Sequence, residues 1–186
     1  MHRVVSTAPP CADRLPDMAV SSEIGRLRRV LIHRPGTEVE EMTPGTAQAL
    51  LYNDIVPVAA VQSEHDQLRR VLALVAETIE VEDVLTEIAA DPEGRAGLVE
   101  RLLGRGHPAA ESLLERWNTL TPMEVVRECV LGISRSPRRL KDLEPGATML
   151  TPPLPNLYFT RDGGFVAGSR VFRSAMASPV RSAESG

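Results

Sequence analysis

The chain has 186 residues and a formal net charge of −4, an acidic balance that gives no electrostatic support for nucleic-acid binding. No apolar run reaches the roughly 20 residues that a membrane-spanning helix needs, and the N-terminus lacks the apolar stretch of a secretory signal. The two cysteines, Cys11 and Cys129, form no disulfide framework, so we expect a cytoplasmic protein that acts without a membrane or a nucleic acid.

The first 83 residues predict a non-periodic lead-in followed by an α/β unit. Residues 1–20 contain three prolines and no hydrophobic periodicity, so we expect them to be disordered, with Met18 as the functional start. The unit in residues 21–83 is predicted to contain a strand over 29–33, a short helix ending at Leu51, a helix from Val58 and a strand over 79–81.

Several polar groups of this unit invite a functional interpretation. A lone His33 at a strand end is interpreted as structural. Glu64, His65 and Asp66 are consecutive on a helix and point in different directions, so we interpret them as surface and capping groups and predict no metal site. The positions of this helix that recur at three- and four-residue steps predict a single face: Val61, His65, Leu68, Val71, Leu72 and Val75.

Residues 84–143 are predicted to be nearly all helical and to form a helical subdomain over 84–145. Asp91-Pro92 starts one helix, the chain breaks over 104–108, and the helix resumes over 109–120. A Thr121/Glu124 capping box starts the next helix, which Gly132 can end. Cys129 lies between valines in the last helix, and we interpret it as a small buried apolar residue rather than a reactive thiol.

Residues 146–186 predict a proline-rich return linker, a strand and a hairpin. The hairpin is indicated by apolar runs on either side of Gly168-Ser169. The strand is predicted over the three hydrophobic residues 157–159, and it would deliver Asp162 beside a flexible Gly-Gly pair. A carboxylate there suits a planar cation such as a guanidinium, although spacing alone also fits an aspartate that caps its own turn.

Four blocks of the sequence resemble arginine deiminases. Residues 155–162 (PNLYFTRD) resemble the signature PN-x-x-FTRD, and residues 22–36 (SEIGRLRRVLIHRPG) resemble the opening SEIGxLKxVLLHRPG. Residues 50–66 carry LLYNDI and QSEHD where the family has LLFDDI and AQxEHD, and residues 176–181 (MASPVR) resemble M-x-x-PAR. Because family members are more than twice this length, the chain resembles the N-terminal part of an arginine deiminase.

The resemblance implies a fold and a site. The fold is an α/β (α+β) chain, an incomplete α/β propeller of the guanidine-modifying superfamily with an inserted helical-bundle subdomain. Asp162 corresponds to a carboxylate that binds the substrate guanidinium, Arg181 to the arginine that binds the substrate α-carboxylate, and Asn156 and Phe159 to residues that line the pocket. No metal or organic cofactor is implied. Neither cysteine and none of the four histidines matches the family's nucleophile or acid/base block.

The expected family activity is hydrolysis of L-arginine to L-citrulline and ammonia in arginine catabolism. Without the nucleophile and acid/base groups, the chain by itself is expected to be inactive. The alternative is a non-catalytic remnant that binds arginine weakly, or that associates with a full-length paralogue through its helical subdomain or as a homo-oligomer. A neighbouring guanidine enzyme, such as a dimethylarginine hydrolase or an amidinotransferase, is disfavoured by the long helical insert.

Overall fold

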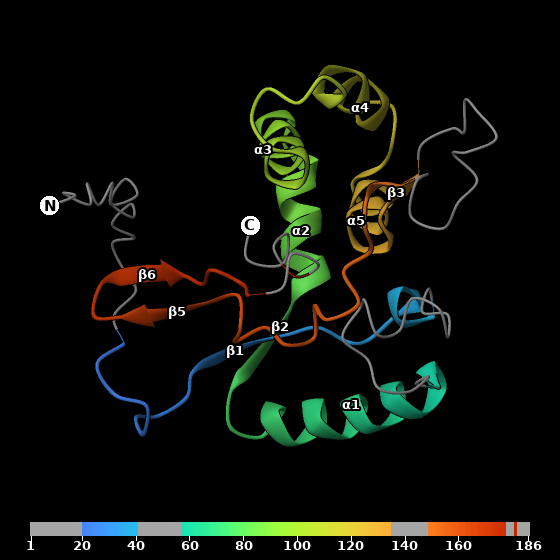
Figure 1. The fold of residues 1–186 in the computed structure, drawn as a ribbon. Coiled ribbons are helices and arrows are strands. Elements are labelled where there is room, and N and C mark those ends of the chain that lie inside the picture. The colour runs from blue at the N-terminus through green and yellow to red at the C-terminus, as the bar shows by residue number, and fades with distance from the viewer. Residues whose placement is uncertain (1–19, 41–56, 135–148, 178–180, 182–186) are drawn as a thin grey trace, which may run out of the picture.

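The computed structural model describes residues 20–40, 57–134, 149–177 and 181, and it has mixed helix and strand content, as the sequence predicts (Figure 1). In chain order its elements are β1 (Arg29–Ile32), the 3₁₀ helix η1 (Thr37–Val39), α1 (Val58–Ala73), β2 (Glu77–Glu80), α2 (Val81–Ala90), α3 (Pro92–Leu103), α4 (Ala110–Trp117), α5 (Pro122–Leu131), β3 (Ile133–Ser134), β4 (Met149–Thr151), β5 (Gly164–Ala167) and β6 (Arg170–Arg173). Residues 1–19 of the lead-in predicted over 1–20, which include Met18, and the helix predicted to end at Leu51 lie outside the described residues.

The first unit is a βαβ arrangement, in which α1 connects two parallel strands. β1 and β2 pair in register from Arg29 with Glu77 to Ile32 with Glu80. Helix α1 lies beneath this pair in Figure 1, on one face of the small sheet. The predicted first strand and the helix from Val58 are confirmed. The second strand begins two residues earlier than predicted and ends at Glu80, because Val81 already belongs to α2.

The helix predicted from the apolar face of α1 is confirmed, but the rest of the molecule covers that face only in part. Val61, His65 and Leu72 are half-buried, as expected of a face that packs on the sheet. Leu68, Val71 and Val75 are 52%, 62% and 62% exposed, and Val75 lies beyond the end of the helix. A two-stranded sheet is too narrow to cover the whole face, so the described residues of α1 are at most half-buried.

The main hydrophobic core is built by α2, α3, α4 and α5, which stand together above the β1–β2 pair in Figure 1, with one further residue from β3. Its buried members are Ala89, Val99, Leu113, Trp117, Val125, Val126, Cys129, Val130 and Ile133. The predicted caps are confirmed: Asp91 Oδ2 accepts a hydrogen bond from Gly94 N at 2.9 Å, and Thr121 and Glu124 form a reciprocal capping box.

The prediction that residues 84–143 are nearly all helical is wrong at Ile133 and Ser134, which form β3 and pair antiparallel with β4. Gly132 ends α5 with φ of 80°, as the sequence predicts, and redirects the chain. A Cβ on Gly132 would lie 2.7 Å from Thr151 O and from Pro153 N, so the two segments approach more closely than a side chain allows. Ile133 N then donates to Thr151 Oγ1 at 3.0 Å.

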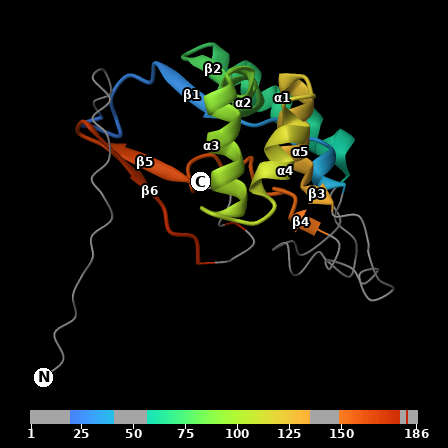
Figure 2. The ribbon, with the colours of Figure 1, turned by 90° about the horizontal axis from the view of Figure 1, so that it is seen from above.

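The hairpin predicted around Gly168 is confirmed as β5 and β6. Gly168 adopts φ of 59°, which the tight turn requires, and it forms an antiparallel bridge with Val20. Phe165 and Phe172 stack across the hairpin with ring centroids 5.1 Å apart. From above, the hairpin extends to one side of the helices, and its C-terminal end leads back towards them (Figure 2).

Candidate ligand-binding site

The segment over residues 155–162 is a succession of turns, so the strand predicted over 157–159 is wrong. Backbone amides of Leu157, Phe159 and Asp162 each donate to the carbonyl three residues earlier, at 3.2, 3.0 and 3.1 Å. Strand propensity reflects packing on a neighbouring strand. The turn-forming residues at 155 and 156 instead direct the chain into local hydrogen bonds.

Both ends of this segment are fixed to the rest of the molecule. At its start, Leu154 N donates to Val130 O of α5 at 2.9 Å, and Leu157 packs against the helical core. At its other end, Thr160 Oγ1 donates to Leu31 O of β1 at 3.0 Å, and Arg161 pairs with Glu23 at 2.8 Å. The segment therefore joins the helical core to the βαβ unit, and it holds the residues between these anchors in place.

Three of the four site residues predicted from the sequence lie together. Arg181 Nη1 donates to Asp162 Oδ2 at 2.8 Å, and the Arg181 guanidinium carbon lies 5.3 Å from the centroid of the Phe159 ring. The Arg181 side chain is 15% exposed and that of Asp162 is 48% exposed. Phe159 is 47% exposed and contacts Tyr158, with ring centroids 4.2 Å apart.

The fourth predicted residue, Asn156, is buried in the same segment with 4% exposure. Its carbonyl accepts the hydrogen bond from Phe159 N, so it shapes the turn that presents the Phe159 ring. The combined arrangement offers a carboxylate beside an aromatic face, which together attract a planar cation by charge and by cation–π interaction.

A buried ionic cluster of His33, Glu38 and Glu80 lies at the end of β1. His33 Nε2 is 3.1 Å from Glu38 Oε1, and His33 Nδ1 is 3.5 Å from Glu80 Oε1. Burial by itself lowers the pKa of His33, but the hydrogen bond to Glu38 and the nearby Glu80 outweigh it and raise this pKa to about 9. The same contacts hold the pKa of both carboxyls below their ordinary value despite burial.

Backbone amides and α1 complete the surroundings of this cluster. Glu38 Oε1 accepts from Gly36 N at 2.6 Å, and Glu80 Oε1 accepts from Arg34 N at 2.7 Å. Arg34 also pairs with Asp66 of α1 through Nε and Nη2, at 2.9 and 3.2 Å. Asp66 therefore links α1 to the segment that follows β1. Its interpretation as a surface or capping group did not predict this ion pair. His33 is 1% exposed, as expected of a structural residue. No signal in the sequence pointed to its two partners, which are 5 and 47 residues away.

Comparisons with known proteins identify the family of this chain. The arginine deiminase family model matches residues 48–186, most of the chain. The chain belongs to the arginine deiminase family. It is 33% identical over 182 residues to the arginine deiminase of Rhodococcus erythropolis, which covers 90% of this chain and 45% of that protein. The arginine deiminases of Bacillus cereus and Listeria welshimeri are each 32% identical and cover 89% of this chain, with 43% and 44% of their own lengths matched. The chain thus spans less than half the length of these curated relatives.

Among the described residues of this arginine deiminase family member, Cys129 is the only cysteine. It is buried in α5, as predicted, and burial together with the neighbouring Glu128 raises the pKa of its thiol to about 12. A thiol with that pKa remains protonated at neutral pH, so Cys129 is not an attacking thiolate. The described part of the chain contains no group of three or more His, Cys, Asp or Glu residues placed to hold a metal ion.

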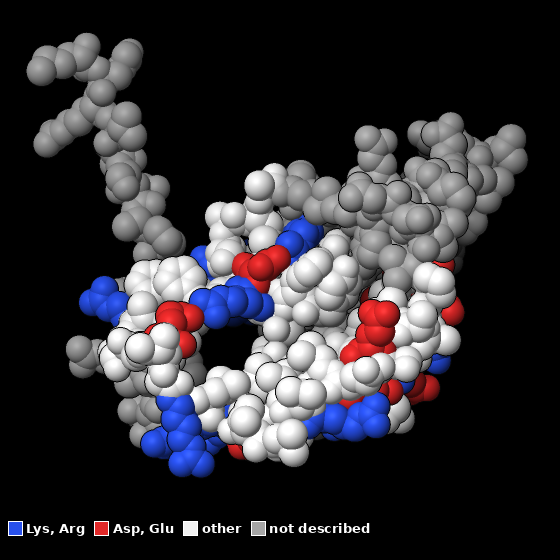
Figure 3. Space-filling model, turned by 90° about the horizontal axis from the view of Figure 1, so that it is seen from below, with Lys and Arg blue, Asp and Glu red and all other residues white. Residues whose placement is uncertain are grey.

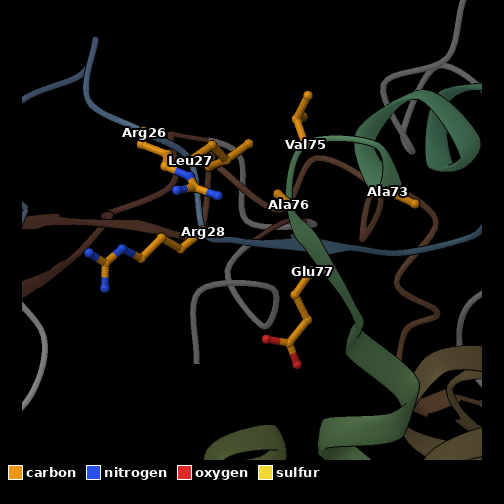
Figure 4. Close-up of a pocket in the computed structure, with 7 residues that line it drawn as sticks. All are labelled: Arg26, Leu27, Arg28, Ala73, Val75, Ala76 and Glu77. Atoms are coloured by element: carbon orange, nitrogen blue, oxygen red, sulfur yellow. The ribbon is translucent and has the colours of Figure 1, made fainter.

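A cavity of about 620 Å³ lies elsewhere, between the chain entering β1 and the α1–β2 turn. It is lined by Arg26, Leu27, Arg28, Ala73, Val75, Ala76 and Glu77, none of which belongs to the predicted site. In Figure 4 the side chains of Arg28, Val75 and Glu77 extend in different directions and do not converge on one point. We therefore place the candidate site at Asp162 rather than in this cavity.

Charged side chains on the face seen from below are interspersed, with acidic and basic groups side by side (Figure 3). Arg26, Arg28 and Arg29 are exposed and form a solvated basic face, and Arg29 pairs with Glu77 at 3.3 Å. No helix in the described part of the chain has both the length and the apolar character needed to traverse a bilayer.

Proposed function

We propose that this chain forms part of an L-arginine site and supplies the residues that bind the guanidinium and the α-carboxylate of the substrate. The reaction proposed for the whole protein converts L-arginine to L-citrulline and ammonia in arginine catabolism. The observation that carries the proposal is the contact of Asp162 with a guanidinium at 2.8 Å, over the face of Phe159. Asp162, Phe159 and Asn156 lie in the segment that matches the family signature, and this supports the same roles here.

Hydrolysis of a guanidinium is difficult because its central carbon is stabilised by resonance and carries positive charge. An enzyme must hold and orient the cation with carboxylates, attack the carbon with a thiolate, and move protons to the departing ammonia and from the attacking water. Overall, one C–N bond is replaced by a C–O bond, water is consumed and ammonia is released. Asp162 meets the first requirement, and it needs no metal or organic cofactor to do so.

We propose that the isolated chain binds L-arginine but does not turn it over. The thiol of Cys129 is buried and protonated, and Cys11 matches no family nucleophile block. His33 is 1% exposed and pairs with Glu38 and Glu80, so it is not placed to exchange protons with a substrate. Loss of a nucleophile from such a catalytic unit costs about 10⁶ in turnover.

The architecture that fits this proposal is an incomplete α/β propeller with an inserted helical subdomain, in a cytoplasmic protein. The βαβ unit of β1, α1 and β2 would be one propeller module over residues 21–83, and β4 to β6 would begin the return to the propeller over residues 146–186. The helical core of α2 to α5 would be the insertion over residues 84–145. Support comes from the separate packing of these helices around their own core.

Purified protein of residues 1–186 tests the function directly. We expect millimolar-range binding of L-arginine by calorimetry and no citrulline above background in a colourimetric assay. Asp162→Asn should weaken arginine binding at least about tenfold, because it removes a charge-assisted contact. Asp83→Asn, an exposed carboxylate of α2, is the matched control and should bind as the wild type does.

Arginine binding that survives Asp162→Asn unchanged would overturn the site. Citrulline production by the wild type that disappears in the Asp162→Asn variant would overturn the proposal that the isolated chain is inactive.

A further inference from the structure

The contact partner of Asp162 in this structure is itself an arginine side chain. Arg181 presents the same functional group as free L-arginine, a guanidinium on a three-methylene chain. It lies 2.8 Å from the Asp162 carboxylate and 5.3 Å from the Phe159 ring centroid, so it makes both contacts that a bound guanidinium would make. Its side chain is only 15% exposed.

We propose that Arg181 is an internal occupant of the guanidinium subsite, and that L-arginine binds by exchange with it. The incoming guanidinium displaces Arg181 from Asp162 and Phe159, and the released Arg181 then receives the α-carboxylate of the ligand. This inference rests on the proposed function, and it adds a competition step to the site.

The exchange follows from the chemistry of the groups. One carboxylate and one aromatic face cannot hold two guanidinium groups in the same contacts, because the two cations would overlap and repel each other. The guanidinium and the α-carboxylate are at opposite ends of the L-arginine molecule. While Arg181 pairs with Asp162, it lies where the ligand guanidinium binds and not where the ligand α-carboxylate would be. Arg181 must therefore move before it can contact the α-carboxylate.

The exchange increases the number of ion pairs for one class of ligand only. A ligand with both a guanidinium and a carboxylate replaces one ion pair, Arg181 with Asp162, by two. A ligand with a guanidinium and no carboxylate replaces that pair by one and leaves Arg181 without an anionic partner from the ligand. Arg181 competes with every guanidinium ligand for Asp162, but it forms a new ion pair only with a ligand that carries an α-carboxylate. It would thus select α-carboxylated guanidines over simple alkylguanidines.

Agmatine, which is arginine without its carboxylate, separates this model from a simple carboxylate-binding role. With exchange, Arg181→Ala removes the competitor, so agmatine should bind about fivefold more tightly, as expected for loss of a partly exposed ion pair. L-arginine also loses its carboxylate contact in this variant, so its preference over agmatine should fall by at least about tenfold.

Calorimetric titration of the full 1–186 chain with each ligand makes this comparison. Arg181→Lys keeps the charge and loses the planar fork, so agmatine should bind it more tightly than the wild type but less tightly than Arg181→Ala. Arg170→Ala, an exposed arginine of the hairpin, is the matched control and should leave both affinities unchanged. Circular dichroism of each variant establishes that it is folded.

Each outcome decides the question. Tighter agmatine binding by Arg181→Ala with a reduced preference for arginine supports the exchange. Agmatine affinity that is unchanged or weaker, while arginine still binds the wild type, would overturn the exchange alone. Failure of both ligands to bind the folded wild type and the folded variants would overturn the proposed arginine site and the exchange with it.

Discussion

The buried His33 should make the protein less stable as the pH rises from near neutral to about 9. Glu38 and Glu80 outweigh the effect of burial and raise the pKa of this histidine from 6.5 to about 9 in the folded protein. A group whose pKa is higher when folded stabilises the fold fully below its unfolded pKa and loses that contribution as the pH rises through its folded pKa. The difference between 6.5 and about 9 corresponds to about 3 kcal/mol, at about 1.4 kcal/mol for each pKa unit.

The measurement is the free energy of unfolding in urea at half-unit steps from pH 6 to pH 9.5. The wild type should lose about 3 kcal/mol across this range. The Cys129 thiol, with a pKa of about 12, does not titrate within this pH range. The pKa of Glu38 and of Glu80 is lowered, so their contribution to stability is lost only as the pH falls into the acid range.

His33→Gln should be less stable than the wild type at pH 6 and should show a nearly flat profile up to pH 9.5. His107→Gln is the matched control, because His107 lies between α3 and α4, away from the cluster, and its Nδ1 accepts from Ala109 N. It should retain the slope of the wild type. A wild-type profile that is already flat between pH 6.5 and 9, or a slope that persists in His33→Gln, would refute the assignment of a protonated histidine between two carboxylates.

Two further predictions concern the connections that hold the site in place. Gly132→Ala should destabilise the protein by about 2 kcal/mol more than Gly104→Ala in urea unfolding. The two glycines have similar positive φ, 80° and 86°, so the backbone strain is matched. Only at Gly132 would a new Cβ meet backbone atoms, at 2.7 Å. Equal losses would contradict the close approach of α5 to β4. Thr160→Val should remove the hydrogen bond to Leu31 O and cost about 1 kcal/mol, with faster amide hydrogen exchange at Asp162; unchanged exchange there would show that this anchor does not hold the segment.

Local chemistry was readable from the sequence wherever a few adjacent residues decide the backbone. The capping box at Thr121, the start at Asp91, the stop at Gly132 and the turn at Gly168 are all confirmed, since each depends on a side chain bonding to its own neighbours or on a glycine supplying positive φ. The burial of Cys129 followed from its place between valines on a helix.

The conformation of residues 155–162 could not be predicted from the sequence alone. The hydrophobic run over 157–159 is compatible with a strand, but a strand forms only beside a partner, and the described residues place none next to this run. Contacts with α5 at one end and with β1 at the other fix the segment as turns. The motif identified the residues, and the tertiary contacts decided how they are presented.

The sequence by itself determined the family and the helix caps at Asp91, Thr121 and Gly132, and it indicated the candidate site residues, because these depend on residue type and short-range order. Only the tertiary structure decided which ion pairs form. The motifs assigned Asp162 and Arg181 to one site, but they did not indicate that the two side chains pair with each other. His33 meets Glu38 and Glu80, 5 and 47 residues away, with no sequence signal at all. Charges attract whichever partner the fold brings near while excluding water, so the pairing, and the raised pKa of His33 with it, is a property of the packed chain.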